Sequence, residues 1–200
     1  NLSAFILAAG LGERLQPITH HIPKPLLPIL GKPVLQSVLE KVIALPINNI
    51  GMNLHHKRNI IENWIKHSAY FENITLFPED PILGTGGALK NAEVFLKNGP
   101  FLVHNSDILS DIDLEKLIEC HVSSGNLATL AVHDYPQFNR LEVDASGLLT
   151  GFLSCREWLE GGWKPAAFTG IAVYQPEFLH FLPPGNSSVV DAWFKALSAG

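Results

Sequence analysis

The sequence predicts an α/β protein: a Rossmann-like three-layer sandwich in which helices cover both faces of a mixed, mostly parallel sheet. Two observations lead to this prediction. Short apolar runs of strand length alternate along residues 4–133 with segments whose apolar residues recur at helical spacing. The resulting order βαβαβαβαβ favours neighbouring parallel strands whose connecting helices pack on the two faces.

The expected strands of this first part are short and apolar. The first, Ala4–Ala9, is a continuous apolar run that stops at Gly10, which is typical of a strand buried on both faces. The later strands are expected at residues 49–53, 74–77, 101–104 and 127–133.

Helical patterns separate these strands. An i, i+3, i+4, i+7 apolar stripe begins at Leu35 and includes Val38, Leu39 and Val42, and Pro46 ends it. A second stripe covers residues 60–65, a third helix is expected at 85–96, and a fourth carries Leu114, Leu117 and Ile118, with Asp111 or Asp113 as its N-cap.

The pattern changes after about residue 136. Arg140–Asp144 and Leu148–Phe152 predict a hairpin with a short turn. A further strand is expected at 168–174, a short helix at 176–181 and a last helix at 188–197. We interpret residues 1–200 as one domain, in which residues 1–135 bind the ligand and residues 136–200 complete the pocket.

Composition and charge exclude several classes of protein. Apolar residues make up 46% and charged residues 16%, so a core can form and disorder is disfavoured. The net charge of −5 argues against nucleic acid as the main partner. The two cysteines, Cys120 and Cys155, lack metal-ligand spacing and favour a reducing compartment, and the Ala4–Ala9 run is too short to span a bilayer. We expect a cytoplasmic protein without a membrane partner.

A glycine loop follows the first strand. Gly10 and Gly12 let the backbone approach a ligand closely, and backbone N–H groups there can hold phosphate oxygens. The loop lies at the carboxyl end of a strand, where ligands bind in parallel sheets. Because it matches neither GxGxxG nor GxxxxGK[ST], a dinucleotide fingerprint and a P-loop are excluded. Taken alone, the loop fits either a phosphate site or an ordinary tight connection.

Two cations follow this loop. Arg14 comes two residues after Gly12, and Lys24 lies between Pro23 and Pro25, which restrict the backbone around it. A reaction between two phosphates needs cations placed beforehand, because the reactants repel each other. We therefore favour a role in phosphate chemistry for Lys24 over that of a solvated loop charge.

Asp107 ends the fourth expected strand. A carboxylate there is a hard oxygen ligand at the sheet edge where ligands bind. Asp111 and Asp113 lie nearer the next helix and can cap it, which leaves Asp107 available for another role. We favour a metal ligand.

Residues 5–33, FILAAGLGERLQPITHHIPKPLLPILGKP, resemble the signature of the sugar-1-phosphate nucleotidyltransferases, also called NDP-sugar pyrophosphorylases. The resemblance continues at residues 78–79, 84–89, 101–107 and 168–171, and so covers nearly the whole chain. It is closest to short single-domain members, such as muramic acid-1-phosphate uridylyltransferases and relatives described as mannose-1-phosphate guanylyltransferases.

The resemblance implies a fold of the nucleotide-diphospho-sugar transferase type and Mg²⁺-dependent transfer of a nucleoside monophosphate from an NTP to a sugar 1-phosphate. We expect a monomer or small homo-oligomer. It implies that Arg14 and Lys24 neutralise the phosphates and that Asp107 holds Mg²⁺. The implied nucleotide-binding residues are Ala8, Ala9, Gly10, Gly12, Glu13, Glu79, Thr85, Gly86, Gly87 and Asn105. The implied sugar-binding residues are Asn53, Glu142, Thr169 and Gly170.

Several of these positions also allow a structural role. Gly86 and Gly87 would leave room for a base beside Glu79, yet the same segment reads as a helix entry with Thr85 as N-cap. Asn53 fits a turn equally well. His104 is expected in the core or in the pocket wall, and Trp193 in the core. Trp158 and Trp163 either cover the sugar or pack at its rim.

Two departures from the family pattern leave the function open. The family's second metal-binding Asp, in a Trp-x-Asp-x-Gly segment, has no counterpart here, so we expect the chain to be truncated at its C-terminus. Asn139–Leu141 replaces a tyrosine–glycine pair near the sugar, and neither base nor sugar is determined. A cytidylyltransferase acting on an alcohol phosphate and a non-catalytic nucleotide-binding homologue are the alternatives.

Overall fold

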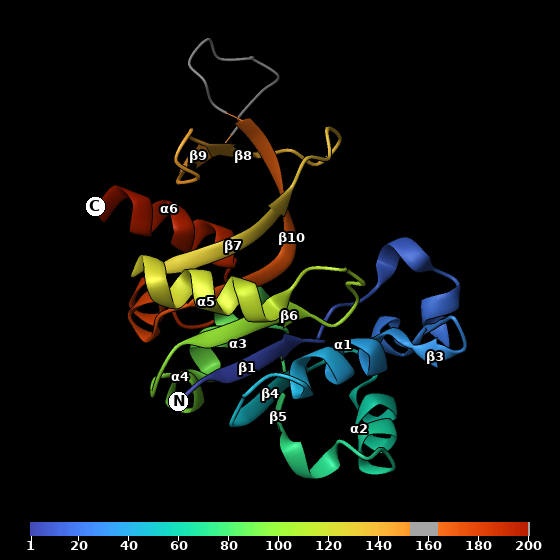
Figure 1. Cartoon of the computed structure of the whole chain (residues 1–200). Helices are drawn as coiled ribbons and strands as arrows, with labels where there is room; N and C mark the ends of the chain where they lie inside the picture. The colour runs from blue at the N-terminus through green and yellow to red at the C-terminus, as the bar shows by residue number, and fades with distance from the viewer. Residues whose placement is uncertain (153–163, 200) are drawn as a thin grey trace.

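A computed structural model of the chain describes residues 1–152 and 164–199. Its main feature is an eight-stranded mixed sheet with helices on both faces, which confirms the expected fold class (Figure 1). The strands run in the order β5-β4-β1-β6-β10-β8-β9, and β7 also pairs with β10. Their bounds are β1 (Ser3–Leu7), β4 (Asn49–Leu54), β5 (Ile74–Pro78), β6 (Phe101–Asn105), β7 (Ala128–His133), β8 (Leu141–Val143), β9 (Leu149–Phe152) and β10 (Lys164–Tyr174).

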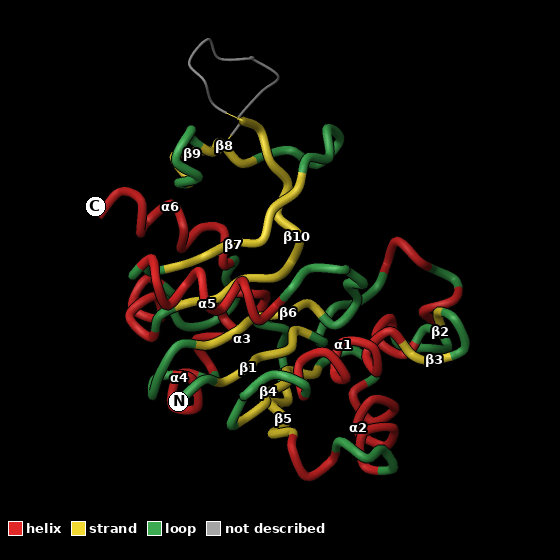
Figure 2. Tube along the Cα trace, in the orientation of Figure 1, coloured by secondary structure: helices red, strands yellow, loops and turns green. Residues whose placement is uncertain are grey.

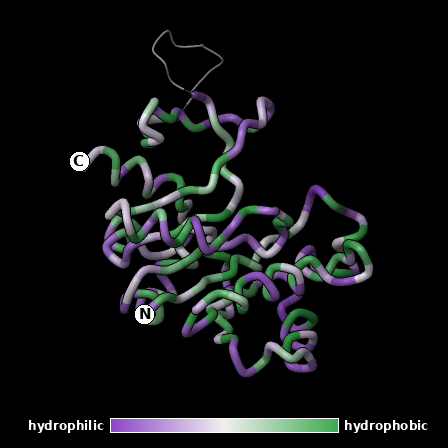
Figure 3. Tube along the Cα trace, viewed as in Figure 1, coloured by the Kyte–Doolittle hydropathy of each residue, from purple (hydrophilic) through white to green (hydrophobic). Residues whose placement is uncertain are grey.

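The first half of the chain forms a parallel block. β1 lies between β4 and β6 and pairs with both in parallel, and β5 pairs in parallel with β4 (Figure 2). Ala4, Phe5 and Ile6 are at most 1% exposed, because helices cover both faces of the central strand. In Figure 3 the trace along β1 is mostly green, because its residues after Ser3 are apolar.

β10 changes the sheet in a way that the sequence order does not indicate. It pairs antiparallel with β6 along one side and with β7 along the other, so β7 runs in the same direction as β6 without pairing with it. The register against β7 shifts between Phe168 and Ala172. The expected hairpin is confirmed as β8–β9, with the Asp144 carboxylate accepting from the N–H groups of Ser146 and Leu148 in the turn.

The helices agree with the apolar stripes, with one break. The α-helices are α1 (Val34–Ile43), α2 (Arg58–Lys66), α3 (Gly84–Asn91), α4 (Glu93–Leu96), α5 (Leu114–Ser124) and α6 (Val189–Ala199). The single helix expected at 85–96 is two helices, separated at Ala92. The remaining elements are the 3₁₀ turns η1 (Glu13–Leu15), η2 (Ile18–His20), η3 (Lys24–Leu26), η4 (Phe71–Asn73) and η5 (Pro176–Phe181), and the small hairpin β2 (Pro28–Ile29) with β3 (Lys32–Pro33).

The two predicted helix caps had different outcomes. The Asp113 carboxylate accepts from the Lys116 N–H at 3.1 Å at the start of α5, which confirms that cap. The prediction that Thr85 is the N-cap of its own helix was wrong. α3 begins at Gly84 with Leu83 as N-cap, and the Thr85 hydroxyl instead accepts from the Val189 N–H at 2.9 Å, at the start of α6.

The core consists of two layers, one on each face of the sheet. One contains the buried residues of α1, α2 and α5, including Leu39, Ile61 and Leu114. The other contains residues of α3, η5 and α6. Trp193 belongs to this second layer and its indole N–H donates to the Tyr174 hydroxyl at 3.1 Å, as a core residue is expected to do. None of the helices in the described ranges is long and apolar enough to cross a membrane.

Candidate functional site

A cavity of about 210 Å³ opens at the carboxyl ends of β1, β4 and β6. Open parallel sheets bind ligands at this edge, because the loops that follow parallel strands all emerge there. The cavity is lined by Leu7, Ala9, Gly10, Lys24, Pro25, Asn53, Ile82, Gly84, Thr85, Asn105, Ser106 and Asp107. It therefore brings together seven of the residues expected at the site, namely Ala9, Gly10, Lys24, Asn53, Thr85, Asn105 and Asp107.

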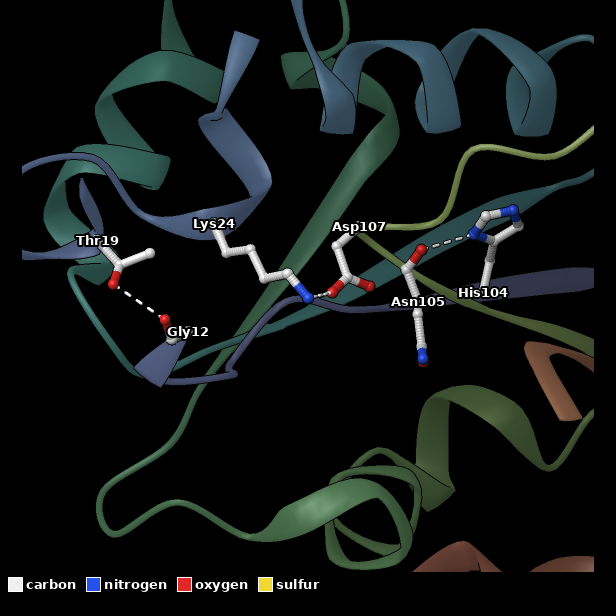
Figure 4. Close-up of polar contacts among 6 residues, drawn as sticks. All are labelled: Gly12, Thr19, Lys24, His104, Asn105 and Asp107. Atoms are coloured by element: carbon white, nitrogen blue, oxygen red, sulfur yellow. Dashed lines mark hydrogen bonds and ion pairs between the residues drawn. The ribbon is translucent and has the colours of Figure 1, made fainter. Parts of the chain in front are cut away.

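The loop after β1 is packed against Thr19 at Gly12 and is open at Gly10. Gly12 has a φ of +69°, and a Cβ there would lie 2.9 Å from the Thr19 Cγ2. The Thr19 hydroxyl donates to the Gly12 carbonyl at 2.9 Å (Figure 4), which fixes the turn. At Gly10 a Cβ would meet no atom within 4 Å. The turn thus requires glycine at Gly12, and Gly10 faces open space at the cavity.

Lys24 and Asp107 form an ion pair at this cavity. Figure 4 shows the Lys24 side chain extended toward the Asp107 carboxylate, and the two groups are in direct contact. Their side chains are 30% and 22% exposed, so both remain accessible to a ligand. Pro23 and Pro25 on either side of Lys24 are buried, which holds the backbone of the lysine in place.

Asn53, which lines the cavity, forms a buried network with Glu79, which does not. The Asn53 side-chain oxygen accepts from the Ala8 N–H at 2.8 Å, and its amide nitrogen donates to the Glu79 carboxylate at 2.8 Å. The other Glu79 oxygen accepts from the Leu83 N–H at 2.9 Å. Glu79 is 3% exposed and is absent from the cavity lining. Both oxygens of its carboxylate accept hydrogen bonds from other protein groups.

The glycines at the start of α3 pack against the C-terminal part of the chain. The Gly86 N–H donates to the Ser187 carbonyl at 2.9 Å, and a Cβ on Gly86 would lie 2.8 Å from the Ser187 hydroxyl. A Cβ on Gly87 would overlap the Gly185 carbonyl. The room that these two glycines leave is thus filled by residues 185–188. Their contact with a nucleotide remains a prediction.

Asn105 and Gly170 meet on the other side of the cavity. Gly170 has a φ of +88°, and a Cβ there would lie 2.5 Å from the Asn105 amide nitrogen. The Thr169 hydroxyl donates to the Ala131 carbonyl at 2.7 Å, which ties β10 to β7 at the register shift. β10 therefore packs through Gly170 against Asn105, a residue of the cavity lining, without lining the cavity itself.

His104 lies next to Asn105 and is a core residue, as expected. It is 1% exposed, and its Nδ1 is 2.7 Å from the Asn105 carbonyl oxygen (Figure 4). Burial lowers the pKa of His104, and the hydrogen bond to Asn105 opposes this only in part.

Other expected site residues lie elsewhere. Glu13 and Arg14 are exposed on η1 and do not line the cavity. Glu142 lies on β8 beside Gly151, where a Cβ would be 2.9 Å from its carboxylate. Ala8 and Gly12 do not line the cavity either. The Ala8 N–H donates to Asn53, and the Gly12 carbonyl accepts from Thr19. Trp158 and Trp163 fall outside the described residues.

Five lining residues were not expected from the sequence: Leu7, Pro25, Ile82, Gly84 and Ser106. Pro25 and Ser106 adjoin Lys24 and Asp107 in the chain, and Gly84 opens the glycine motif, so their positions were available from neighbours. Nothing in the local sequence indicates Ile82.

A second cavity, of about 570 Å³, lies away from the strand ends. Its lining comes from η3, α1, α2 and the residues that follow α2, including Trp64 and Tyr70, whose rings are 6.4 Å apart. It contains no Asp, Glu, Lys or Arg among its lining residues. The charged groups that phosphate chemistry requires are therefore found only at the first of these two cavities.

Comparisons with known proteins agree with this geometry. A family model described as nucleotidyl transferase matches residues 3–142. UTP–glucose-1-phosphate uridylyltransferase of Synechocystis sp. is 31% identical over 202 residues, which cover 92% of this chain and 52% of that protein. D-glycero-alpha-D-manno-heptose 1-phosphate guanylyltransferase of Campylobacter jejuni is 34% identical over 151 residues, covering 76% of this chain and 67% of that protein.

A solved structure is similar over most of the chain. The crystal structure of HddC from Yersinia pseudotuberculosis complexed with GMP-PN superposes with a TM-score of 0.75 at 26% identity, and the match covers 93% of this chain and 82% of that one. The chain spans about half the length of the Synechocystis relative.

Proposed function

The chain belongs to the nucleotidyl transferase family, and we propose that it transfers a nucleoside monophosphate from an NTP to a sugar 1-phosphate, with release of pyrophosphate. One observation carries this proposal. The ion pair of Lys24 and Asp107 lies at a cavity that also includes the Gly10 loop, at the carboxyl ends of three parallel strands. The names of the relatives, which act on sugar 1-phosphates, support the acceptor class.

The proposed step joins two anions. An oxygen of the sugar phosphate attacks the α-phosphorus of the NTP in line. A new P–O bond forms as the bond from that phosphorus to the bridging oxygen of the β-phosphate breaks, and pyrophosphate leaves with the electron pair. The attacking phosphate is already anionic at neutral pH, so no protein nucleophile or general base is needed. The enzyme's task is to hold the two phosphates together against their repulsion.

Lys24 is the proposed cation for this task. Its ammonium is partly exposed at the cavity, and its backbone is restrained by buried prolines on both sides. A positive charge held in place stabilises the charge that develops on the transferring phosphoryl group without reorganising. Arg14 is the weaker candidate, since it is exposed on η1 outside the cavity lining, and we propose it only as an outer contact for the phosphates.

Asp107 is the proposed holder of Mg²⁺. The ion is usually held in enzymes by one or two carboxylates together with substrate phosphates, and Asp107 supplies one such carboxylate at the cavity. No cluster of three or more Asp, Glu, His or Cys residues that could hold a metal occurs in the described part of the chain, so the donor set fits a shared site of this kind and not a closed protein cage. When bound, the ion would neutralise phosphate charge. The ion pair with Lys24 balances the Asp107 charge and keeps both groups at the cavity.

We propose that the two parts of the chain have the separate roles that the sequence predicts. Residues 1–135 would bind the nucleotide, and residues 136–200 would complete the acceptor side. The approach of Gly170 on β10 to Asn105 supports this, because it joins the second half to the cavity. A cytoplasmic location, and a monomer or small homo-oligomer without nucleic acid as a partner, belong to the same proposal.

A screen of pyrophosphate release tests the function. It crosses UTP, GTP, CTP, ATP and dTTP with common sugar 1-phosphates and with phosphocholine, in the presence of Mg²⁺. Release with a sugar 1-phosphate that disappears in Asp107→Asn supports the proposal. Release only with CTP and phosphocholine would assign a cytidylyltransferase, and NTP binding without release, in this chain and in a longer version, would assign a non-catalytic homologue.

A further inference from the structure

We propose that Asn53 and Glu79 are a pair of positioning residues that set the spacing between two walls of the nucleotide cavity. They would act through the protein backbone, since Glu79 lies outside the cavity lining and Asn53, which lines the cavity, is engaged by Ala8 and Glu79. The inference rests on the proposed function only in naming the ligand as an NTP. It assigns to Asn53 and Glu79 a role other than the sugar and base contacts expected from the sequence.

The bridge is a chain of three hydrogen bonds. It begins at the Ala8 N–H, which donates to the Asn53 oxygen at 2.8 Å, and continues from the Asn53 amide nitrogen to one Glu79 oxygen at 2.8 Å. It ends at the Leu83 N–H, which donates to the other Glu79 oxygen at 2.9 Å. Because Ala8 and Leu83 present donors, the positions of the side-chain oxygens and of the Asn53 amide are determined by their partners.

The two ends of the bridge adjoin the segments that line two walls of the cavity. Ala8 precedes Ala9 and Gly10, which line one wall, and Leu83 precedes Gly84 and Thr85, which line another. No backbone hydrogen bond joins residues 8–10 to residues 82–85, both of which the structure describes. The bridge is thus the direct polar link between these two segments.

Because the bridge is buried, its polar groups depend on one another for hydrogen bonds. Asn53 and Glu79 are each 3% exposed, and no Lys, Arg or His in the described ranges forms an ion pair with Glu79. A buried carboxylate without a cation depends on the N–H donors around it. Glu79 is also held through its backbone, since its N–H donates to the Leu54 carbonyl at 2.7 Å and its carbonyl is 3.0 Å from the His55 Nδ1.

The donor and acceptor pattern allows only certain pairs of side chains. Each end must offer an acceptor to a backbone N–H, and the middle must join one donor to one acceptor. One amide and one carboxylate satisfy this in either order. Two carboxylates would face each other as like charges, and two amides would leave one N–H facing another.

This pattern defines the test. Asn53→Asp and Glu79→Gln are each close in shape to the natural residue, yet each breaks one bond of the bridge. The double variant N53D/E79Q restores all three bonds with donor and acceptor exchanged, and it keeps the net charge. Binding of UTP and of GTP, each with Mg²⁺, is measured by calorimetry for the four proteins, and circular dichroism checks that each is folded.

We expect each single variant to bind the nucleotide about ten- to a hundred-fold more weakly, as loss of a buried hydrogen bond would predict. The double variant should return to within about three-fold of the natural protein, since its bridge is complete. A double variant no better than the weaker single variant would overturn the proposal in favour of direct contact by Glu79. Natural affinity in both single variants would also overturn it.

Hydrogen exchange on the natural protein gives a second readout that needs neither a variant nor a ligand. The amides of Ala8 and Leu83 should exchange slowly, and fast exchange at both would overturn the bridge. These measurements also separate the two proposals. Absence of turnover or of nucleotide binding in the natural protein would count against the transferase, whereas the bridge would still be decided by exchange at Ala8 and Leu83.

Discussion

The Lys24 ammonium contacts the Asp107 carboxylate although the two residues are 83 positions apart in the sequence. The pair joins a proline-flanked turn to the end of β6 at the cavity. Both side chains are partly exposed, so a substrate can reach either partner, and water screens the pair enough that it contributes little to stability. The effects of removing either partner should therefore appear in activity.

Lys24→Ala is expected to lower turnover at least about a hundred-fold, because a cation placed against the phosphates is lost. The free energy of unfolding should change by about 1 kcal/mol, since water still reaches both partly exposed side chains and screens the pair. Pyrophosphate release and thermal unfolding measure the two effects. Lys32→Ala is the matched control, since Lys32 pairs with Glu40 outside the cavity. Equal loss of turnover in both variants would contradict a specific role for Lys24.

Asp107→Asn is expected to lower turnover by a similar factor, of about a hundred-fold or more, and to raise the Mg²⁺ concentration that gives half-maximal rate. A chelator should abolish turnover in the natural protein, and added Mg²⁺ should restore it. Asp111→Asn, an exposed residue in the loop that follows, serves as the control. Unchanged Mg²⁺ dependence in Asp107→Asn would mean that the ion is held elsewhere.

Gly170→Ala tests the approach of β10 to the cavity. Gly170 has a φ of +88°, and a Cβ added there would lie 2.5 Å from the Asn105 amide nitrogen. Gly147 has almost the same φ, +89°, but a Cβ there meets no atom within 4 Å, so Gly147→Ala reports the backbone strain alone. We expect Gly147→Ala to destabilise the fold by about 1 kcal/mol and Gly170→Ala by roughly 1–3 kcal/mol more. Urea unfolding gives both values, and equal losses would show that the contact with Asn105 is unimportant.

Stability should depend on pH through two buried histidines. Burial is the main cause that lowers the pKa of His104, and it also lowers that of His121, from an ordinary value of 6.5. Below pH 6.5 the unfolded chain takes up protons that the folded protein does not, so stability is complete above this pH and falls as the pH drops toward the folded pKa values. Urea unfolding between pH 8 and pH 5 measures this decline.

The pH effect can be assigned with a variant. His121 is fully buried, and its Nδ1 is 2.9 Å from the Thr129 hydroxyl. His121→Asn keeps a polar group near Thr129 but cannot gain a proton, so it should flatten the decline. His20→Asn, at an exposed position, should leave it unchanged. An identical slope in all three proteins would place the pH dependence elsewhere.

Much of the fold follows from local sequence patterns. Three examples are the apolar run at Ala4–Ala9, the stripe beginning at Leu35 and the cap at Asp113, each of which depends on residues within a few positions of one another. The structure contains all three, although the strand covers Ser3–Leu7 and ends before Ala8. Several parts of the cavity could also be located, because parallel strands bring their ends to one edge. Asn53, Asn105 and Asp107 lie at or just after strand ends and meet there for this reason, whereas Lys24 reaches the cavity from η3.

Contacts between distant segments decided the rest. The Thr85 hydroxyl accepts from the Val189 N–H, and the glycines of α3 pack against residues 185–188. The Asn53–Glu79 bridge joins two walls of the cavity. Each of these joins residues 26 or more positions apart. The layers, the edge of the sheet where the cavity lies and the charged residues Lys24 and Asp107 could be predicted from the sequence, since local periodicity, strand direction and short motifs indicate them. Their ion pair could not, because it joins residues 83 positions apart. Which glycines and polar side chains line the cavity, and which pack against other parts of the protein, became known from the three-dimensional contacts alone, because that depends on what each residue packs against.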